Sequence, residues 1–231
     1  MSGPILIQGA MEVETDWLAA QLEHCEAITI GGYRFWKGSC GDRELVVSRT
    51  EIGELNAACV TTLGILHFAP GAVINQGIAG SHSEEVHIGD IIVGESCVHI
   101  NDWETQLRGR GEGTDPLSWS RGMVDPLLLP GDTALLKCFL RASYSSGKLI
   151  KGRLGSGDLF SREYDRILWL CKKCGHLCED MESIAVYKVC QRFNVPCLGV
   201  RIISNNELTG EPYTPAVGEQ LQKLVLEMLI K

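Results

Sequence analysis

The stretch "GVRIISNN", residues 199–206, decides the fold class. Residues 200–203 predict a buried strand, which ends in the polar pair Ser204 and Asn205. In open α/β sheets, ligands bind where the strands end, so polar groups at such a position often meet a ligand. Asn205 is therefore either a turn residue or part of a binding site.

Strand and helix patterns alternate on both sides of this stretch. Strands are predicted at 4–10, 27–40, 43–50, 71–80, 88–100, 148–158 and 197–204. Helices are predicted at 15–25, 52–68, 132–146, 161–174, 182–193 and 216–230, with Asp132 as an N-terminal cap. This alternation predicts one α/β domain, residues 1–231, with helices flanking a largely parallel sheet.

Composition narrows the class of partner. The chain has 231 residues, 45% of them hydrophobic and 22% charged, as is ordinary for a globular domain. Its net charge of −8 disfavours nucleic acid and anionic membrane surfaces as partners. The first residues carry no basic stretch, and no apolar run is long enough for a membrane span. We expect a cytoplasmic protein with no membrane contact.

Ten cysteines raise the question of a metal site. The segment "CKKCGHLC" places Cys171, Cys174, His176 and Cys178 close together, and a Cys-x-x-Cys pair can bind zinc. The second half of the motif is too compressed for the usual ligand spacing. The same letters also fit a helix end, a glycine turn and a new strand. We predict no bound metal and no cofactor, with reduced cysteines.

The motifs that follow the predicted strands form a recognisable order. They are "GAMEVE", "INQGIAG", "IGDIIV", "SGDLF", "EDMES" and "RIISN". In this order and spacing, from residue 5 to residue 205, the chain resembles the 5′-methylthioadenosine/S-adenosylhomocysteine nucleosidases of the nucleoside phosphorylase superfamily. The resemblance implies a three-layer α/β/α fold around a central mixed, largely parallel sheet, and commonly a homodimer. It also implies hydrolysis of the bond between a purine and a 5′-substituted ribose.

The resemblance assigns roles around the sugar. Glu14 matches the carboxylate that activates the attacking water, and Met181 and Glu182 match the pair that packs under the ribose and holds its hydroxyls. The chemistry agrees, because glycosidic cleavage passes through an oxocarbenium-like state that a nearby carboxylate stabilises. Taken alone, Glu14 and Glu182 would instead be first-turn acids favoured by a helix dipole.

The resemblance also assigns roles around the base. Phe160 matches an aromatic that stacks on the base, and the backbone of Ser161 matches a contact with the base edge. Asn205 stands where the nucleosidases have an aspartate, Ile78 where they usually have a serine, and Asp180 in place of a more usual glutamate. An aspartic acid can protonate the departing purine, whereas an amide cannot.

The Asn205 amide does not decide whether the base of the substrate is adenine or a 6-oxopurine. Phosphorylases for hypoxanthine and guanine nucleosides use an asparagine at the base, and futalosine hydrolases carry a similar "ISN". Asparagine also pairs with adenine N6 and N7. The overall resemblance favours an adenine nucleoside, with a 6-oxopurine nucleoside as the alternative.

Two further alternatives concern the reaction itself. Related phosphorylases hold phosphate with an arginine and a serine where this chain has Asn75 and Ile78, and with an arginine in the first loop, which is absent from "GAMEVETD". A fourth ligand is an arginine from a neighbouring subunit, and only Arg43 stands at a position resembling it. We therefore expect hydrolysis rather than phosphorolysis. A nucleoside-binding protein without catalysis is the remaining alternative, and turnover of any purine nucleoside would exclude it. The Trp-bearing segment 101–131 is expected to cover the 5′ substituent.

Overall fold

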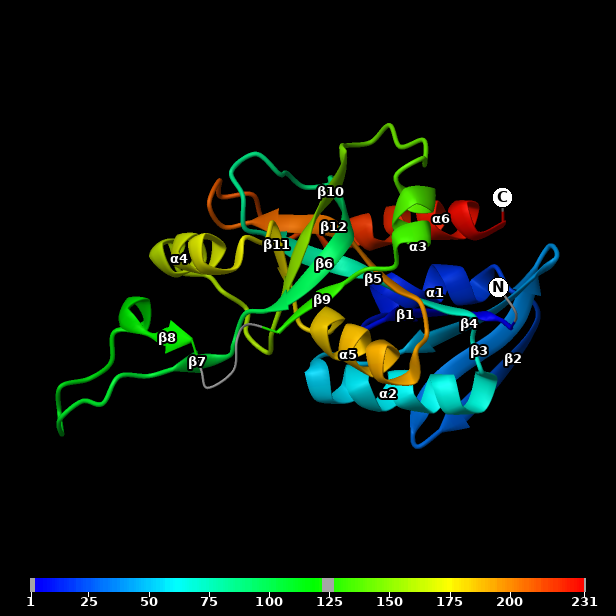
Figure 1. Ribbon diagram of the computed structural model, residues 1–231. Coiled ribbons are helices and arrows are strands. Elements are labelled where there is room, and N and C mark those ends of the chain that lie inside the picture. The colour runs from blue at the N-terminus through cyan, green and yellow to red at the C-terminus, as the bar shows by residue number, and fades with distance from the viewer. Residues whose placement is uncertain (1–2, 122–126, 231) are drawn as a thin grey trace.

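A mixed β-sheet forms the centre of the protein in the computed structural model, which describes residues 3–121 and 127–230 (Figure 1). Its strands run in the order β11, β10, β6, β12, β5, β1, β4, β3 and β2, with β9 beside β6. Their bounds are β1 Ile5–Gly9, β2 Glu23–Ile30, β3 Tyr33–Cys40, β4 Arg43–Arg49, β5 Ala72–Ser81, β6 Ile91–His99, β9 Leu128–Pro130, β10 Leu149–Ser156, β11 Cys178–Asp180 and β12 Cys197–Asn206.

Strand pairing makes the sheet mixed, as predicted. Strands β4, β1, β5 and β12 are parallel neighbours, and so are β6, β10 and β11. Antiparallel pairs join β12 to β6 and build the β2–β3–β4 meander. Strand β11 pairs with β10 on one side and with β5 on the other, so five strands close into a ring. This closure brings the end of β11 next to the ends of β5 and β12.

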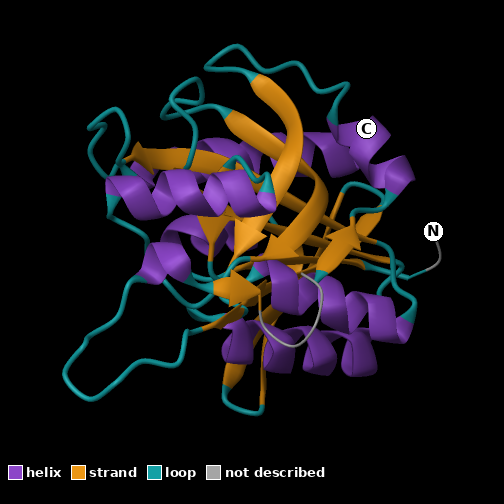
Figure 2. Ribbon diagram, turned by 60° about the vertical axis from the view of Figure 1, so that its left-hand side comes forward, coloured by secondary structure: helices purple, strands orange, loops and turns teal. Residues whose placement is uncertain are grey.

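Helices cover both faces of the sheet, which confirms the predicted three-layer arrangement (Figure 2). One face packs on α1 Glu12–Ala20, α3 Thr133–Phe139 and α6 Gly218–Ile230, and the other on α2 Glu54–Phe68 and α5 Ser183–Phe193. The alternation of β1 explains both contacts, because Ile5 and Ile7 enter the first core and Leu6 enters the second. All three side chains are almost fully buried.

Helix α4, Tyr164–Cys174, packs on the Trp-bearing segment 101–131, whose sequence has neither helical nor strand periodicity. This segment holds β7 Trp103–Glu104, the short 3-10 helix η1 Pro116–Ser118 and β8 Ser120–Arg121, and β7 and β8 pair as a hairpin. The Arg166 guanidinium lies over the rings of Trp103, Trp119 and Trp169. The described part of the segment therefore packs on α4. Residues 122–126 lie outside the described residues.

Helix boundaries differ from the predictions in α1, α3 and α4. The helix predicted at 132–146 ends at Phe139, and the helix predicted at 161–174 begins at Tyr164. The first helix begins at Glu12 rather than near residue 15 and ends at Ala20, because residues 23–30 pair with β3 as a strand. Asp132 caps α3 as predicted, its carboxylate accepting from the N–H groups of Ala134 and Leu135.

A second 3-10 turn, η2 Pro215–Val217, precedes α6. Across the described ranges, every helix is too short or too polar to span a bilayer.

Candidate active site

A cavity of about 230 Å³ opens where four strands of the sheet end. The ends of β1, β5, β11 and β12 contribute to its walls, as the positions of the polar motifs predicted. Its described lining residues are Ala10, Met11, Glu14, Ile52, Ile78, Ala79, Gly80, Leu159, Phe160, Glu179, Asp180, Met181, Glu182, Ser204, Asn205 and Tyr213. The cavity thus brings together five of the six residues that the sequence assigned to the site.

Glu14 enters the cavity from the first turn of α1, where backbone donors surround its carboxylate. One oxygen, Oε2, accepts from the N–H groups of Ala10 at 2.5 Å and Met11 at 3.0 Å, and Oε1 accepts from Ile78 N–H at 2.8 Å. Burial raises the pKa of Glu14, and these three donors oppose that shift. The result is a fixed carboxylate of increased basicity, which suits a general base.

Gly77 makes this position possible. A Cβ at residue 77 would lie 2.6 Å from Glu14 Oε1, closer than two such atoms can approach. The glycine of "INQGIAG" is therefore required by the neighbouring carboxylate rather than by a turn.

Glu182 lies at the N-terminal cap of α5 and faces the same cavity. Its Oε1 accepts a backbone hydrogen bond from Gly53 N–H at 2.9 Å. Burial, followed by the nearby carboxylates of Asp180 and Glu14, raises the pKa of Glu182 to about 8. At neutral pH this side chain is therefore mostly protonated. Met181, which lies between Asp180 and Glu182 in the sequence, also lines the cavity.

A buried ion pair supports the floor of the site. Arg201 Nε lies 3.1 Å from Asp180 Oδ2, and both side chains are almost completely buried. Asp180 Oδ1 also accepts from the N–H groups of Glu182 and Ser183 at 2.9 and 2.8 Å. Burial acts to lower the pKa of Arg201, but the surrounding carboxylates outweigh it and the net shift is upward. Arg201 thus stays charged and fixes the turn that presents Glu182.

Asn205 lies near the end of β12, 2% exposed, beside a register irregularity that follows Ile203. Its Oδ1 accepts from the Ser204 hydroxyl at 3.0 Å, and its Nδ2 donates to Glu207 Oε1 across a long 3.5 Å. The Ser204 contact orients the amide, which lines the cavity with its remaining hydrogen-bonding capacity. The residue is therefore part of the cavity wall rather than a solvent-exposed turn.

The aromatic wall differs from the prediction at one residue. Phe160 lines the cavity and is half exposed, but Ser161 is buried behind it. Its N–H and its hydroxyl each donate to the Glu179 carboxylate at 2.7 Å. The Ser161 N–H is thus already engaged, so the expected contact of its backbone with a base would have to use the carbonyl oxygen. Glu179 itself reaches the cavity at this point.

The residues that resembled phosphate ligands do not form an anion site in this chain. Asn75 is 1% exposed, and its Oδ1 accepts from Arg201 and Ser183. Ile78 lines the cavity with an apolar side chain, and its N–H is bound to Glu14. Arg43 is an exposed residue at the start of β4, whereas the cavity lies where the strands end. Among the described lining residues there is no lysine or arginine.

Sequence reasoning missed several residues of the site. Arg201 stands inside an otherwise apolar strand, and a charge in such a run was a usable signal for a buried ion pair. Glu179 is the first residue of the "EDMES" motif and could have been noticed as an additional acid there. Tyr213 lines the cavity from a loop with no local pattern, so only the fold identifies it.

Comparison with known proteins adds an independent line of support. The model of the phosphorylase superfamily matches residues 4–229. A 5′-methylthioadenosine/S-adenosylhomocysteine nucleosidase of Geobacillus kaustophilus is 32% identical over 231 residues, covering 96% of this chain and 95% of the relative. The chain belongs to this nucleosidase family, within the phosphorylase superfamily.

Solved structures agree with that membership. A Helicobacter pylori 5′-methylthioadenosine/S-adenosylhomocysteine nucleosidase, solved with butyl-thio-DADMe-Immucillin-A, shares 25% identity at a TM-score of 0.84, covering 99% of this chain and 98% of the other. The native futalosine hydrolase of H. pylori has the same fold, at 24% identity, a TM-score of 0.83, and coverage of 99% and 97%. The predicted family, fold and enzyme class, an N-glycosyl hydrolase, are confirmed.

Proposed function

We propose that this protein hydrolyses the N-glycosidic bond of a 5′-substituted adenosine of the methylthioadenosine or S-adenosylhomocysteine type, releasing adenine and the free sugar. One observation carries the proposal. The Glu14 carboxylate, held by three backbone N–H groups, faces the same cavity as Glu182, Met181 and Asn205. The names of the curated relatives point to the same substrate class.

The chemistry assigns one task to each acid. Glu14 accepts a proton from a water that attacks the anomeric carbon, which its fixed position and raised pKa favour. As the bond to the base breaks, positive charge develops on the ribose. Ionised Glu182 would stabilise that charge and accept hydrogen bonds from the sugar hydroxyls. The surroundings of Glu182 raise its pKa to about 8, and substrate hydroxyls that donate to the ionised form would lower this pKa on binding.

The hydrogen bonds around Asn205 support adenine as the base. Glu207 takes one amide hydrogen, which leaves one N–H for purine N7, and Oδ1 keeps a lone pair for the adenine N6 amino group. Glu179, at the same cavity, offers a carboxylate that can accept from N6. A 6-oxopurine would instead need both amide hydrogens and would place O6 near a carboxylate.

A 6-oxopurine nucleoside is the second candidate, and the amide itself is the observation that favours it. Rotation of the Asn205 amide away from Glu207 would present both hydrogens, to N7 and O6, because the 3.5 Å contact that holds one of them is weak. The two candidates differ only at the base edge, so the same cavity serves both.

Base selectivity of the wild type and of Asn205→Asp tests the proposal. We expect wild-type kcat/KM to be higher for 5′-methylthioadenosine than for 5′-methylthioinosine. We also expect Asn205→Asp to raise kcat on the adenine substrate by about 10-fold or more, because a protonated Asp can donate the N7 proton. A wild type that prefers the 6-oxo substrate, and loses that preference in Asn205→Asp, would establish the second candidate. If neither protein turned over either substrate, the remaining hypothesis would be a protein that binds nucleosides without catalysis.

We further propose a cytoplasmic homodimer. The family resemblance supports it, and so does the position of the Trp-bearing segment, whose described residues contribute nothing to the cavity wall. A second subunit would then cover the 5′ substituent. Light scattering during size-exclusion chromatography should give twice the 25.3 kDa chain mass, and a monomer mass would contradict the dimer.

A further inference from the structure

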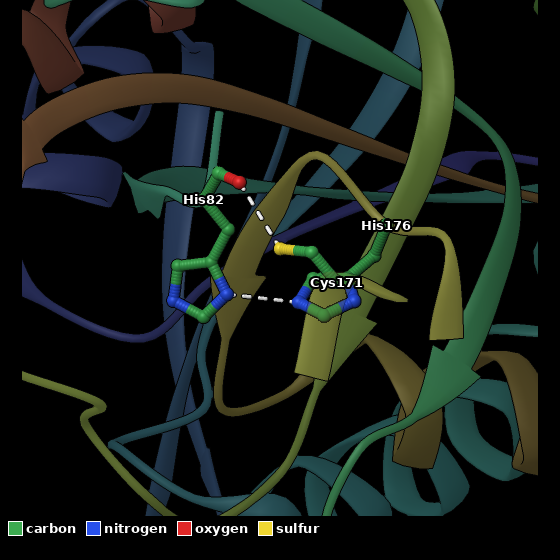
Figure 3. A group of neighbouring side chains, drawn as sticks. All are labelled: His82, Cys171 and His176. Carbon is green, nitrogen blue, oxygen red and sulfur yellow. Dashed lines mark hydrogen bonds between the residues drawn. The ribbon is translucent and has the colours of Figure 1, made fainter. Parts of the chain in front are cut away.

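Three side chains with metal-binding atoms, His82, Cys171 and His176, lie together in the fold (Figure 3). His82 contacts Glu179, which lines the cavity. His82 follows β5, Cys171 lies in α4, and His176 stands between α4 and β11. Their ligand atoms all lie within 4.8 Å of one another, and His82 Nδ1 is 2.8 Å from His176 Nε2. Both histidines are at most 5% exposed, and Cys171 is partly buried.

The composition of this cluster differs from the one that the sequence suggested. Cys171 and His176 belong to "CKKCGHLC", but the third member comes from a segment nearly 90 residues earlier, His82. The spacing objection to a zinc site applied to ligands drawn only from the motif. It does not apply to a set that the fold assembles from two distant segments.

We propose that His82, Cys171 and His176 bind one Zn²⁺ ion. A thiolate with two imidazoles is a ligand set that zinc prefers. At usual bond lengths, the nitrogens of two tetrahedral ligands lie about 3.3 Å apart. The two rings would therefore separate by only about 0.5 Å from their present hydrogen-bonded position to admit the ion. A water molecule would complete four-coordination, as in zinc sites with three protein ligands.

The surroundings of His82 support the assignment independently. Its other ring nitrogen, Nε2, lies 3.4 Å from Glu179 Oε2, and both side chains are nearly inaccessible to solvent. A histidine that binds a metal usually donates its second N–H to a carboxylate, which fixes the ring and its tautomer. Here Nδ1 contacts His176, and Nε2 lies 3.4 Å from such a carboxylate.

The site would stabilise one wall of the cavity. Glu179 accepts from both the N–H and the hydroxyl of Ser161, and Ser161 follows Phe160. A cation bound to His82 would thus fix a chain of contacts that ends at the aromatic side chain of the cavity. The metal has a positioning role in this arrangement, and the proposal does not depend on which nucleoside is cleaved.

Zinc content tests the site directly. The full chain should be produced without a histidine tag in zinc-supplemented medium, and about one zinc per chain is expected by mass spectrometry of the metal. Removal with a chelator should lower Tm by several degrees, and added Zn²⁺ should restore it. Less than about a tenth of a zinc per chain, with no response of Tm to Zn²⁺, would overturn the proposal and leave a hydrogen-bonded histidine pair.

Matched cysteine variants test the ligand set. Cys171→Ser should lose the zinc, whereas Cys174→Ser, in the same Cys-x-x-Cys pair but outside the cluster, should keep it. Cobalt-loaded wild type should show thiolate-to-Co²⁺ charge-transfer absorption, which Cys174→Ser retains. If Cys171→Ser does not fold, this absorption in the wild type still decides whether a thiolate binds the metal. Zinc loss in Cys174→Ser, or a cobalt spectrum without the thiolate band, would contradict the assigned ligands.

Discussion

Glu14 and Glu182 face one cavity, but the backbone holds them differently. Three N–H groups bind the Glu14 carboxylate, whereas the N–H of Gly53 is the backbone donor to Glu182. Burial raises the pKa of both acids, and at Glu182 the neighbouring carboxylates of Asp180 and Glu14 add to it, so that its pKa is about 8. Two neighbouring acids with different supports can take different roles, one as a base and one as a partner of the sugar.

Replacement of the proposed base should abolish most of the activity. We expect Glu14→Gln to reduce kcat by at least about 10²-fold, because an amide cannot accept the proton of the attacking water. Adenine binding, measured by calorimetry, should change little.

The matched control for this variant is Glu12→Gln. Glu12 lies in the same turn of α1 but is exposed and paired with Arg49. It should keep near-wild-type kcat. If Glu14→Gln turned over as fast as this control, Glu14 would not be the base.

Glu182 should also make stability depend on pH. The unfolded side chain ionises near its ordinary pKa of 4.5, but the folded one stays protonated up to about pH 8. Between these values unfolding releases a proton, so the free energy of unfolding falls as pH rises and levels off above pH 8. Glu182→Gln removes the ionisable group and with it this fall in the free energy of unfolding. Its Tm should exceed that of the wild type by roughly 5 °C or more at pH 8.5 and by much less at pH 5.

The control for the pH experiment is Glu219→Gln, which changes an exposed acid of α6. Its Tm should stay close to that of the wild type at both pH 5 and pH 8.5, because substitutions of exposed residues change stability little. A Glu182→Gln difference that is equally constant would mean that the folded protein does not raise the pKa of Glu182.

At the scale of secondary-structure elements, β12 combines an apolar strand with a buried charge. Arg201 donates to the carbonyl oxygens of Asn75 at 2.8 Å and Val200 at 3.0 Å, in addition to its ion pair with Asp180. It therefore links β12, β5 and the turn before α5. The apolar neighbours predicted the strand correctly, but they gave no partner for the charge, which Asp180 supplies once β11 pairs with β5 beside β12.

Loss of this cation should destabilise the fold strongly. Arg201→Met leaves the Asp180 carboxylate buried without its partner, and we expect the free energy of unfolding to fall by about 3–5 kcal/mol in urea titrations. Asp180→Asn in the same chain should recover part of this loss.

The comparison is Lys223→Met, which breaks an exposed i,i+4 pair with Glu219. It should cost less than about 1 kcal/mol. Equal effects of the two single variants would show that the Arg201 pair contributes no more than a surface pair.

Local signals explain which elements the sequence predicted well. Asp132 caps its helix as expected, because an N-terminal cap needs only a short-range hydrogen bond. The start of α1 was placed late, because Met11 is not a usual capping residue, and the side chain that accepts from the Met11 N–H is Glu14, three residues further on. The segment from 101 to 131 has no period, and its packing on α4 depends on the distant Arg166.

At the scale of the whole molecule, alternating strands and helices were enough to predict the layered fold. They could not predict the closure of the sheet, because β11 has three residues and its two partners lie far away in the sequence. That closure brings Glu179 and Glu182 to Asn205 and also brings His176 to His82. Order of motifs along the chain therefore identified much of the cavity, while the contacts between distant segments required the structure.

The origin of the oxygen on the released sugar tests the central claim most directly. The wild-type protein should be incubated with 5′-methylthioadenosine in H₂¹⁸O, with and without phosphate, and the sugar product analysed by mass spectrometry. We predict equal rates under both conditions and free 5-methylthioribose that carries ¹⁸O at the anomeric carbon, because Glu14 activates water and the described lining of the cavity offers no cationic side chain for phosphate. Formation of 5-methylthioribose 1-phosphate, with turnover only when phosphate is present, would contradict hydrolysis.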